Sequence, residues 1–420
     1  MIGDLLRVTG IAGVAARLRT GLADPEFRKL SVLIATSFID MIGFAMVFPL
    51  LPFYALKLNA TPEVIGVITA SFSVAQLASA PLWGWVSDHY GRRPALLVGL
   101  TASAIAYVVF GFATSIWLLL ASRLIQGAGG GTTGVAQAYV SDSITPARRA
   151  QALGWLSAAT SLGVAIGPAL GSWSVTFGSA GPGLVAAALC LLNVWFTWRW
   201  LPESRVAAAP GTVKARRPIW GVLRNVVRHP GEPVSRLILI YGAGMLGFAA
   251  MTSVFALFLD AKFGITEKTI GLFFVFTGVL SFVMRAIVLG PAVRRLGEVG
   301  AMRLGTVSLV IGLVAYPLMP TVWTLLLVMP LVPIGTALLF PATTALMSRS
   351  ADPALVGTTL GVAQTAAGTA RVVAPLMATS AFQRLGVGAP FFLAAAIVGG
   401  VGVVASRLSV ALAGPAERAG

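Results

Sequence analysis

The chain has 420 residues, of which 57% are hydrophobic and only 10% are charged, and its mean hydropathy is +0.88. A water-soluble fold cannot bury so much apolar surface, so the composition excludes an ordinary soluble enzyme and indicates a protein that lies in lipid. The formal net charge of +16 does not indicate a nucleic-acid-binding protein, because the basic residues lie between apolar runs and not on one soluble module.

Cysteine and histidine residues are too few to build a disulfide framework or a metal centre. Cys190 is the single cysteine, and the two histidines, His89 and His229, fall in predicted loops. The sequence lacks a Gly-Lys-Ser/Thr phosphate-binding motif and a credible hydrolase constellation. We therefore predict no metal, no cofactor and no enzymatic activity, and we expect no removable signal peptide because an early apolar core is missing.

Residues 1–28 alternate apolar and basic side chains at roughly helical spacing, as Leu5, Arg7 and Ile11 illustrate. This pattern fits an amphipathic helix that lies on the membrane surface. It fits a partly ordered tail equally well, so both interpretations stay open.

The rest of the chain consists mainly of long apolar runs, each close to or above the ~20 residues that cross the hydrocarbon core as a helix. We therefore predict an all-α membrane protein with twelve transmembrane helices. The twelve runs lie near residues 30–56, 63–84, 94–114, 116–141, 149–176, 181–201, 236–261, 268–290, 301–320, 322–348, 355–382 and 388–409.

A long polar segment divides the chain into two halves. We predict an N-terminal six-helix bundle at residues 29–202, a cytoplasmic linker at 203–235, a C-terminal six-helix bundle at 236–410 and a tail at 411–420. Weak matches at a nearly constant offset indicate an internal duplication, and therefore two pseudo-symmetric bundles. Ile65-Gly66 recurs as Ile270-Gly271, Gly84 as Gly290 and Pro168 as Pro375.

Most of the 30 lysine and arginine residues fall in segments on one side of the predicted helices. The basic residues assigned to the opposite side are Lys57, Lys262, Lys268 and Arg384. The positive-inside rule therefore predicts a multi-pass inner-membrane protein with both termini in the cytoplasm, and the excess charge adds some attraction to anionic lipid.

The loop between the second and third runs carries a dense hydrophilic motif, G-x-x-x-D-x-x-G-R-R, which is formed by Gly84, Asp88, Gly91, Arg92 and Arg93. It resembles the loop between helices 2 and 3 of major facilitator superfamily transporters. The resemblance implies the fold of that family, in which two six-helix bundles rock about a central site. In the second half, Arg294 stands where the acid would be and Glu298 where the base would be, so we expect the two loops to play different parts.

The same resemblance adds Asp142 and Arg149, which are spaced around Pro146, to a charged cluster with the loop motif. We expect this cluster to bridge the two bundles and to act as a gate when the cytoplasmic side is shut. The alternative is a solvated surface cluster, in which each exposed ion pair contributes only ~0–1 kcal/mol.

Three further motifs resemble the drug:proton antiporter branch of this superfamily. Asp40 lies in the first run ahead of Pro49 and Pro52, Arg123 opens the pattern R-x-x-Q-G in the fourth, and Gly163, Gly167, Pro168 and Gly171 form G-x-x-x-G-P-x-x-G in the fifth. Small residues four positions apart let another helix approach closely, and proline bends its helix. The resemblance implies export of a drug-like molecule in exchange for protons.

Asp40 and Arg123 are the proton-coupling residues that the resemblance implies. A carboxylate near the bilayer centre costs about 2.5–3.5 kcal/mol, so Asp40 is expected to face a wet cavity or a partner. At ~1.5 Å per residue, the two residues lie at levels that differ by only about 4 Å, close enough to interact directly or through water. The alternatives are a neutral Asp40 that hydrogen-bonds a neighbouring helix, and a fixed structural ion pair.

Substrate contacts are expected from aromatic and polar residues on helices that line the central cavity in this family. The candidates are Phe44, Phe48, Gln126, Gln364 and Arg371. For Arg371 we expect contact with a polar or anionic group. Arg285 lies near the cytoplasmic end of its helix and is expected to snorkel to the membrane surface.

These patterns together predict a proton-coupled secondary transporter that works as a monomer, with membrane lipid, protons and a small molecule as its partners and no nucleic acid. Two alternatives stay open. One is a facilitator or flippase for an amphipathic metabolite or lysolipid without strict proton coupling. The other is a membrane receptor or assembly partner that keeps the fold but does not transport.

Overall fold

The structure is a computed structural model that describes residues 25–204, 224, 226, 228–352 and 355–406. Within this part of the chain every regular element is a helix, as lipid requires of a backbone that must satisfy its own hydrogen bonds. The predicted segment 1–28 up to residue 24, most of the linker at 203–235 and the tail at 411–420 lie outside the described residues.

In the N-terminal half, proline and glycine residues divide two of the predicted runs into separate helices. The first predicted run divides near Pro49, and the fourth divides at Gly130 and Gly131. The helices are α3 (Pro25–Val47), α4 (Leu51–Lys57), α5 (Pro62–Tyr90), α6 (Arg92–Gly111), α7 (Ile116–Gly129), α8 (Thr132–Ser143), α9 (Pro146–Ser174), the short 3-10 turn η1 (Val175–Phe177) and α10 (Gly181–Trp200).

The C-terminal half contains α12 (Pro233–Phe263), α13 (Ile270–Val283), the π-helical turn η2 (Met284–Val288), α14 (Leu289–Leu318), α15 (Val322–Val328), α16 (Leu331–Ser350), α17 (Val356–Leu385) and α18 (Ala389–Ser406). Helix α14 begins at the end of the eighth predicted run, includes the second copy of the loop motif, and continues through the ninth predicted run. The chain bends inside it at Gly297, whose φ of 68° is tolerated because glycine has no Cβ atom.

Eight helical stretches of the described chain are long and apolar enough to cross a membrane. The predicted class, an all-α membrane protein, is therefore confirmed. The count of twelve crossings stays a prediction, because some predicted runs are divided into pieces such as α7 and α8, with 14 and 12 residues. Neither piece is long enough to span the hydrocarbon core by itself.

The two halves meet mainly through two helix pairs, α5 with α17 and α9 with α13, with a smaller contact of α4 with α12. Gly66 of α5 lies so close to α17 that a Cβ atom on it would stand 2.0 Å from Thr379 Oγ1. In the other pair, the N–H group of Gly271 donates a hydrogen bond to Ser172 Oγ at 2.9 Å. Glycine at both crossings removes the side chain that would hold the backbones apart.

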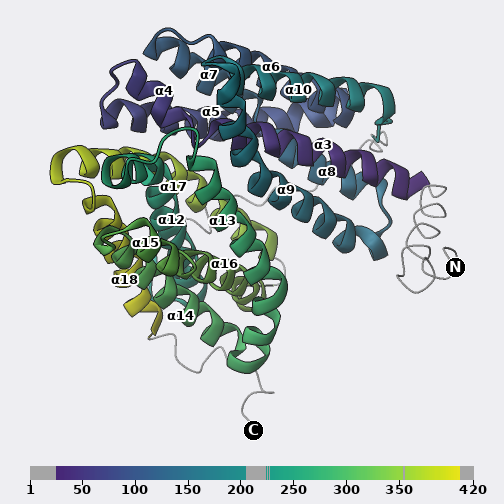
Figure 1. Cartoon of the computed structure of the whole chain (residues 1–420). Helices are drawn as coiled ribbons and strands as arrows, with labels where there is room; N and C mark the ends of the chain where they lie inside the picture. The colour runs from purple at the N-terminus through teal and green to yellow at the C-terminus, as the bar shows by residue number, and fades with distance from the viewer. Residues whose placement is uncertain (1–24, 205–223, 225, 227, 353–354, 407–420) are drawn as a thin grey trace, which may run out of the picture.

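Two ion pairs join the halves near these crossings. Lys57 Nζ lies 2.5 Å from Glu267 Oε1, and Arg384 Nε lies 2.7 Å from Glu63 Oε1. We call this end of the molecule, marked by those four residues, the closed end. From there the halves diverge, so that α8 and the start of α9 stand apart from α14 and α16 (Figure 1). We call that opposite end, which holds the turn between α5 and α6, the open end.

Candidate functional site

A cavity of about 750 Å³ lies among α3, α6, α8 and α9, and Arg285 of η2 contributes to its wall from the C-terminal half. Its volume falls within the ~300–1,000 Å³ that is usual for small-molecule sites. Much of its polar lining consists of hydroxyl groups, including those of Thr36, Ser37, Thr133 and Ser157. The cavity therefore offers neutral hydroxyl groups together with one acid and one base.

The acid is Asp40 of α3, which lines this cavity although its side chain is only 8% exposed. Thr132, the first residue of α8, donates a hydrogen bond from Oγ1 to Asp40 Oδ2 at 2.8 Å. Thr132 holds this position because the chain breaks at Gly130 and Gly131 and restarts as α8 beside α3. The hydrogen bond stabilises the ionised carboxylate.

Arg123 of α7 is buried, at 4% exposure, and it forms no ion pair with Asp40 in the described structure. Its Nε donates to Ser122 Oγ at 3.3 Å, its guanidinium carbon lies 5.3 Å from the centre of the Phe110 ring, and its Nη2 has no hydrogen-bond partner. Of the two predicted interactions, direct or through water, the direct contact is absent from this conformation.

Tyr107 of α6 lies near both Asp40 and Arg123. Its hydroxyl accepts a hydrogen bond from Gln126 Nε2 at 2.7 Å, and the ring lies against Gly43, where a Cβ atom would stand 3.2 Å from Tyr107 Cε2. The phenol lies within electrostatic reach of both Asp40 and Arg123. Sequence reasoning missed this residue, because nothing in its local pattern distinguishes it from an ordinary core aromatic.

The five predicted substrate residues do not gather around the cavity, since none of them is among its lining residues. Phe44 stacks with Phe48 at 6.0 Å and contacts Phe72 of α5 at 5.3 Å between ring centres. Gln126 is buried against Tyr107, as described above. In the C-terminal half, Gln364 Nε2 donates to Tyr241 OH at 3.2 Å, and Arg371 is exposed.

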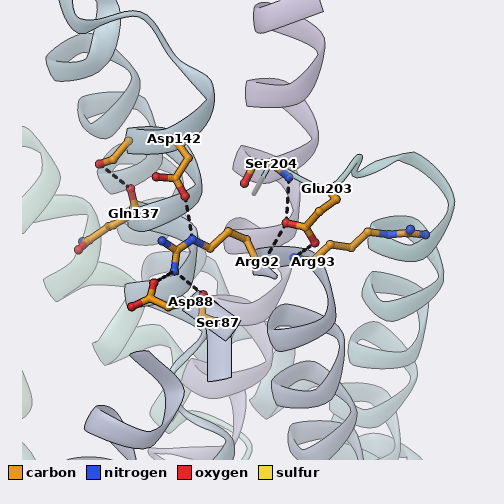
Figure 2. Close-up of polar contacts among 9 residues, drawn as sticks. Ser87, Asp88, Arg92, Arg93, Gln137, Asp142, Glu203 and Ser204 are labelled. Atoms are coloured by element: carbon orange, nitrogen blue, oxygen red, sulfur yellow. Dashed lines mark hydrogen bonds and ion pairs between the residues drawn. The ribbon is translucent and has the colours of Figure 1, made fainter. Parts of the chain in front are cut away.

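The loop motif forms a connected polar cluster at the open end (Figure 2). Arg92 donates from Nε to Asp142 Oδ2 at 2.8 Å, and from Nη1 to Asp88 Oδ1 at 2.6 Å and to Ser87 Oγ at 2.8 Å. One guanidinium thus joins α5, α6 and α8. All four residues belong to the N-terminal half, so these contacts do not bridge the bundles in this conformation.

Glu203, which directly follows α10, completes the cluster from the other side (Figure 2). Its carboxylate accepts the backbone N–H groups of Arg92 at 2.9 Å and Arg93 at 3.1 Å. These groups are two of the donors that the start of a helix leaves without intrahelical partners, and a negative charge is favoured there. From the sequence alone, Glu203 was assigned to the linker. An acidic residue directly after a membrane-spanning run could have indicated a role in the cluster.

The side chains of two predicted members of the cluster make no ion pair with its acids. Arg93 donates from Nη2 to the backbone carbonyl of Trp198 and has no ion pair in the described structure. Arg149 does not pair with Asp142, and its buried Nε lacks a hydrogen-bond partner. In this conformation the Asp142 carboxylate pairs with Arg92, and the part that Arg149 plays in the cluster when the cytoplasmic side is shut stays a prediction.

A sequence profile described as Major Facilitator Superfamily matches residues 33–375. The chain belongs to the major facilitator superfamily. Members of this superfamily are transporters and not enzymes, so the protein is a multi-pass membrane transporter.

Two relatives of this superfamily member are drug-resistance proteins. Multidrug resistance protein 2 of Bacillus subtilis is 28% identical over 323 residues, which cover 76% of this chain and 80% of that protein. Tetracycline resistance protein, class B, of Escherichia coli is 26% identical over 280 residues, 66% of this chain and 69% of that protein. The solved structure of a human organic anion transporter, at 24% identity, has a TM-score of 0.66 over 91% of this chain and 100% of that chain, which shows the shared fold.

The second copy of the superfamily loop motif keeps its geometry with the charges exchanged. Glu298, the counterpart of Arg92, lies 3.1 Å from Arg349 Nη2 of α16, where the N-terminal half has Asp142 on α8. The glycine ahead of each helix has a positive φ, +105° at Gly91 and +68° at Gly297. Each half therefore has an ion pair between its loop motif and a neighbouring helix, with the acid and the base exchanged.

The antiporter motif on α9 packs directly against α3. A Cβ atom on Gly163 would stand 2.7 Å from the carbonyl oxygen of Phe38, one on Gly167 2.6 Å from Ala45 Cβ, and one on Gly171 2.4 Å from the carbonyl oxygen of Met46. The predicted close approach of a neighbouring helix is thus present. Pro168 faces the other half, since its carbonyl oxygen would stand 2.3 Å from a Cβ atom on Gly271.

Arg285 does not follow its prediction. The side chain was expected to snorkel to the membrane surface, and instead it lines the cavity that contains Asp40. It lies in the π-helical turn η2, and π-helical turns occur frequently at functional sites. The sequence shows only that Arg285 lies within an apolar run. It does not show which way the side chain points around the helix axis.

Proposed function

We propose that this transporter exports a drug-like or amphipathic small molecule across the inner membrane in exchange for protons, by alternating access. The observation that carries the proposal is the position of Asp40, which is the one carboxyl group among the residues that line the cavity. A carboxyl group in a cavity shared by two rocking bundles can exchange its proton with whichever side the cavity faces.

The proton step uses Asp40 and Thr132. When the carboxyl group releases its proton, the hydrogen bond of 2.8 Å from Thr132 Oγ1 stabilises the carboxylate that remains. This hydrogen bond joins α8 to α3. Protonation and deprotonation of Asp40 would therefore change how tightly these two helices pack. Arg123 would act on this step through Tyr107 and Gln126, because its guanidinium makes no direct contact with the carboxylate.

We infer that the open end faces the cytoplasm and that both termini lie there. The support is the distribution of basic residues, most of which fall on the side of Arg92 and Arg93. In this orientation the structure is an inward-facing state, and the closed end with its two ion pairs faces outward. Release of the substrate outside requires these contacts to part.

The substrate would contact the aromatic and polar residues near the path between the halves. Phe44 lies one turn beyond Asp40 on α3, Phe48 directly follows that helix, and the two stacked rings offer an apolar wall. Gln126, Gln364 and Arg371 would supply the polar contacts as the bundles rock. We infer that the protein works as a monomer in membrane lipid, with protons and the substrate as its other partners.

The names of the relatives agree with this substrate class, since both relatives are drug-resistance proteins. The test uses rhodamine 123, a drug-like amphipathic dye, and inside-out membrane vesicles from cells that express the protein. An acid vesicle interior is expected to drive dye uptake. Asp40→Asn is expected to abolish uptake driven by the pH gradient, a loss of about 100-fold or more, because general acid–base groups typically contribute factors of this size.

Asp260→Asn is the matched control, because Asp260 lies at the end of α12 and does not line the cavity. It is expected to leave uptake unchanged. Dye flux that follows only the dye gradient, and is equal in wild type and Asp40→Asn, would contradict proton exchange and favour a facilitator. A complete lack of dye flux in either direction would favour a receptor or assembly partner.

A further inference from the structure

We propose that the substrate is dipolar, with an anionic group that binds Arg285 and a cationic group that binds Asp40. This inference rests on the proposed function and names the chemical class of its substrate. It starts from the fact that the two residues line the same cavity from opposite halves of the molecule.

Arg285 has no partner of its own in the described structure. It forms no ion pair, and no hydrogen bond to its guanidinium is present. Arg285 is an exposed residue at the cavity wall, and ionisable groups within membrane-spanning helices that face a water-accessible cavity mark substrate or ion pathways. The structure therefore keeps a positive charge at the cavity wall without neutralising it, as an anion site requires.

The surroundings of Arg285 also suit an anion. The same cavity wall carries Ser157 and Ser161 of α9 and Gln137 of α8. The side chains of these three residues make no hydrogen bond in the described structure, so their donors are available. A guanidinium combined with neutral donors is the usual arrangement for a carboxylate, sulfonate or phosphate group.

Asp40 defines the opposite requirement. A purely anionic substrate would be repelled by the ionised carboxylate, so its binding would favour the protonated form and would oppose an exchange of substrate for protons. A cationic group has the reverse effect, because it competes with the proton for the carboxylate. A dipolar molecule therefore pairs with both charges of the cavity and still allows substrate to be exchanged for protons.

The location of the two charges gives the dipolar substrate a mechanical role. Asp40 lies on α3 of the N-terminal half, and Arg285 lies on η2 of the C-terminal half, beside the crossing of α9 and α13. A molecule that binds both residues joins the two halves across the cavity, and it can thereby shift the balance between open and closed arrangements.

The test compares two dyes that differ in one group. Rhodamine 110 carries a delocalised positive charge and a free carboxylate, and rhodamine 123 is its methyl ester, which lacks the negative charge. Binding to the purified protein is measured by fluorescence anisotropy. The wild type is expected to bind rhodamine 110 at least about tenfold more tightly, which is the factor that one charge-assisted hydrogen bond supplies.

The variants separate the two charges. Arg285→Gln is expected to remove the preference for rhodamine 110 and to leave the affinity for rhodamine 123 unchanged. Arg285→Lys is expected to retain most of the preference for rhodamine 110. Arg285→Glu is expected to reverse the preference, a gain that an unfolded protein cannot show. Arg295→Gln, which changes an exposed arginine outside the cavity, is the matched control.

Equal affinity of the wild type for the two dyes would overturn the inference, as would a preference that survives in Arg285→Glu. Either result leaves the proposed exchange intact if uptake of rhodamine 123 still depends on Asp40. Conversely, the wild type could prefer rhodamine 110 through Arg285 while uptake of rhodamine 123 does not depend on Asp40. That result would contradict the proton exchange and would still support the dipolar site. Failure of both dyes to bind would overturn the inference as well.

Discussion

Two glycines of the loop motif have opposite environments. Gly91 has φ +105° and ψ 160°, and a Cβ atom on it would stand 2.5 Å from Glu203 Oε2. Gly84, in the middle of α5, has nothing within 4 Å of its Cβ position. The motif therefore contains one glycine that the local backbone requires and one that this conformation leaves unexplained.

Gly91→Ala is expected to lower the free energy of unfolding by about 1–3 kcal/mol, because the backbone region is nearly restricted to glycine and the new methyl group displaces the carboxylate that caps α6. Gly84→Ala is expected to leave stability unchanged or to raise it by up to ~1 kcal/mol, since alanine is the better helix former. Thermal unfolding of the purified protein in detergent measures both. A larger loss for Gly84→Ala than for Gly91→Ala would contradict this reading.

Gly66 shows how one helix pair fixes the arrangement of the two halves. It lies in the first turns of α5, directly opposite Pro375 and Thr379 of α17. The equivalent crossing of α9 and α13 uses Gly271 in the same way. Both pairs meet near the closed end, so we expect them to act as the pivots about which the halves separate.

Gly66→Leu is expected to force α5 away from α17 and to shift the population toward separation at the closed end, because a Cβ atom there meets Thr379 Oγ1 at 2.0 Å. Spin labels at Thr114 and Lys268, on opposite halves, report the distance by electron resonance. Gly400→Leu on α18 is the control, since its Cβ position is open. An unchanged distance distribution in Gly66→Leu would exclude this crossing as a pivot.

Across the whole molecule, we expect the balance between closed and open arrangements to depend on the ion pairs of the closed end, Lys57 with Glu267 and Glu63 with Arg384. Exposed pairs contribute ~0–1 kcal/mol each, so breaking both changes the ratio of closed to open molecules by up to roughly 30-fold. This range is large enough to change a transport cycle and too small to unfold the protein.

Glu63→Gln combined with Glu267→Gln is therefore expected to lengthen the mean distance between the same two labels and to leave the melting temperature nearly unchanged. Reversing one pair, with Lys57→Glu and Glu267→Lys together, is expected to restore the closed population. If the double glutamine variant and the wild type give identical distances in low and high salt, the ion pairs do not hold the closed end.

Apolar composition and the spacing of polar loops determined much of this protein in advance. A chain this apolar must fold in lipid, and lipid demands helices. The short spacing of Asp88 and Arg92 in one loop also favours the contact of 2.6 Å that they make. The glycines of α9 likewise predicted a close helix neighbour, which is α3. These features follow from local geometry and from the solvent alone.

Partners that are distant in sequence were decided only by the tertiary structure. Counting residues along a helix gives a depth, but the direction of a side chain around the helix axis depends on breaks and packing. The break before α8 brings Thr132 to Asp40, Tyr107 lies where a direct contact between Asp40 and Arg123 was expected, and the π turn coincides with Arg285 at the cavity wall. The sequence determined which charges are in the membrane, and the fold decided which of them share a cavity.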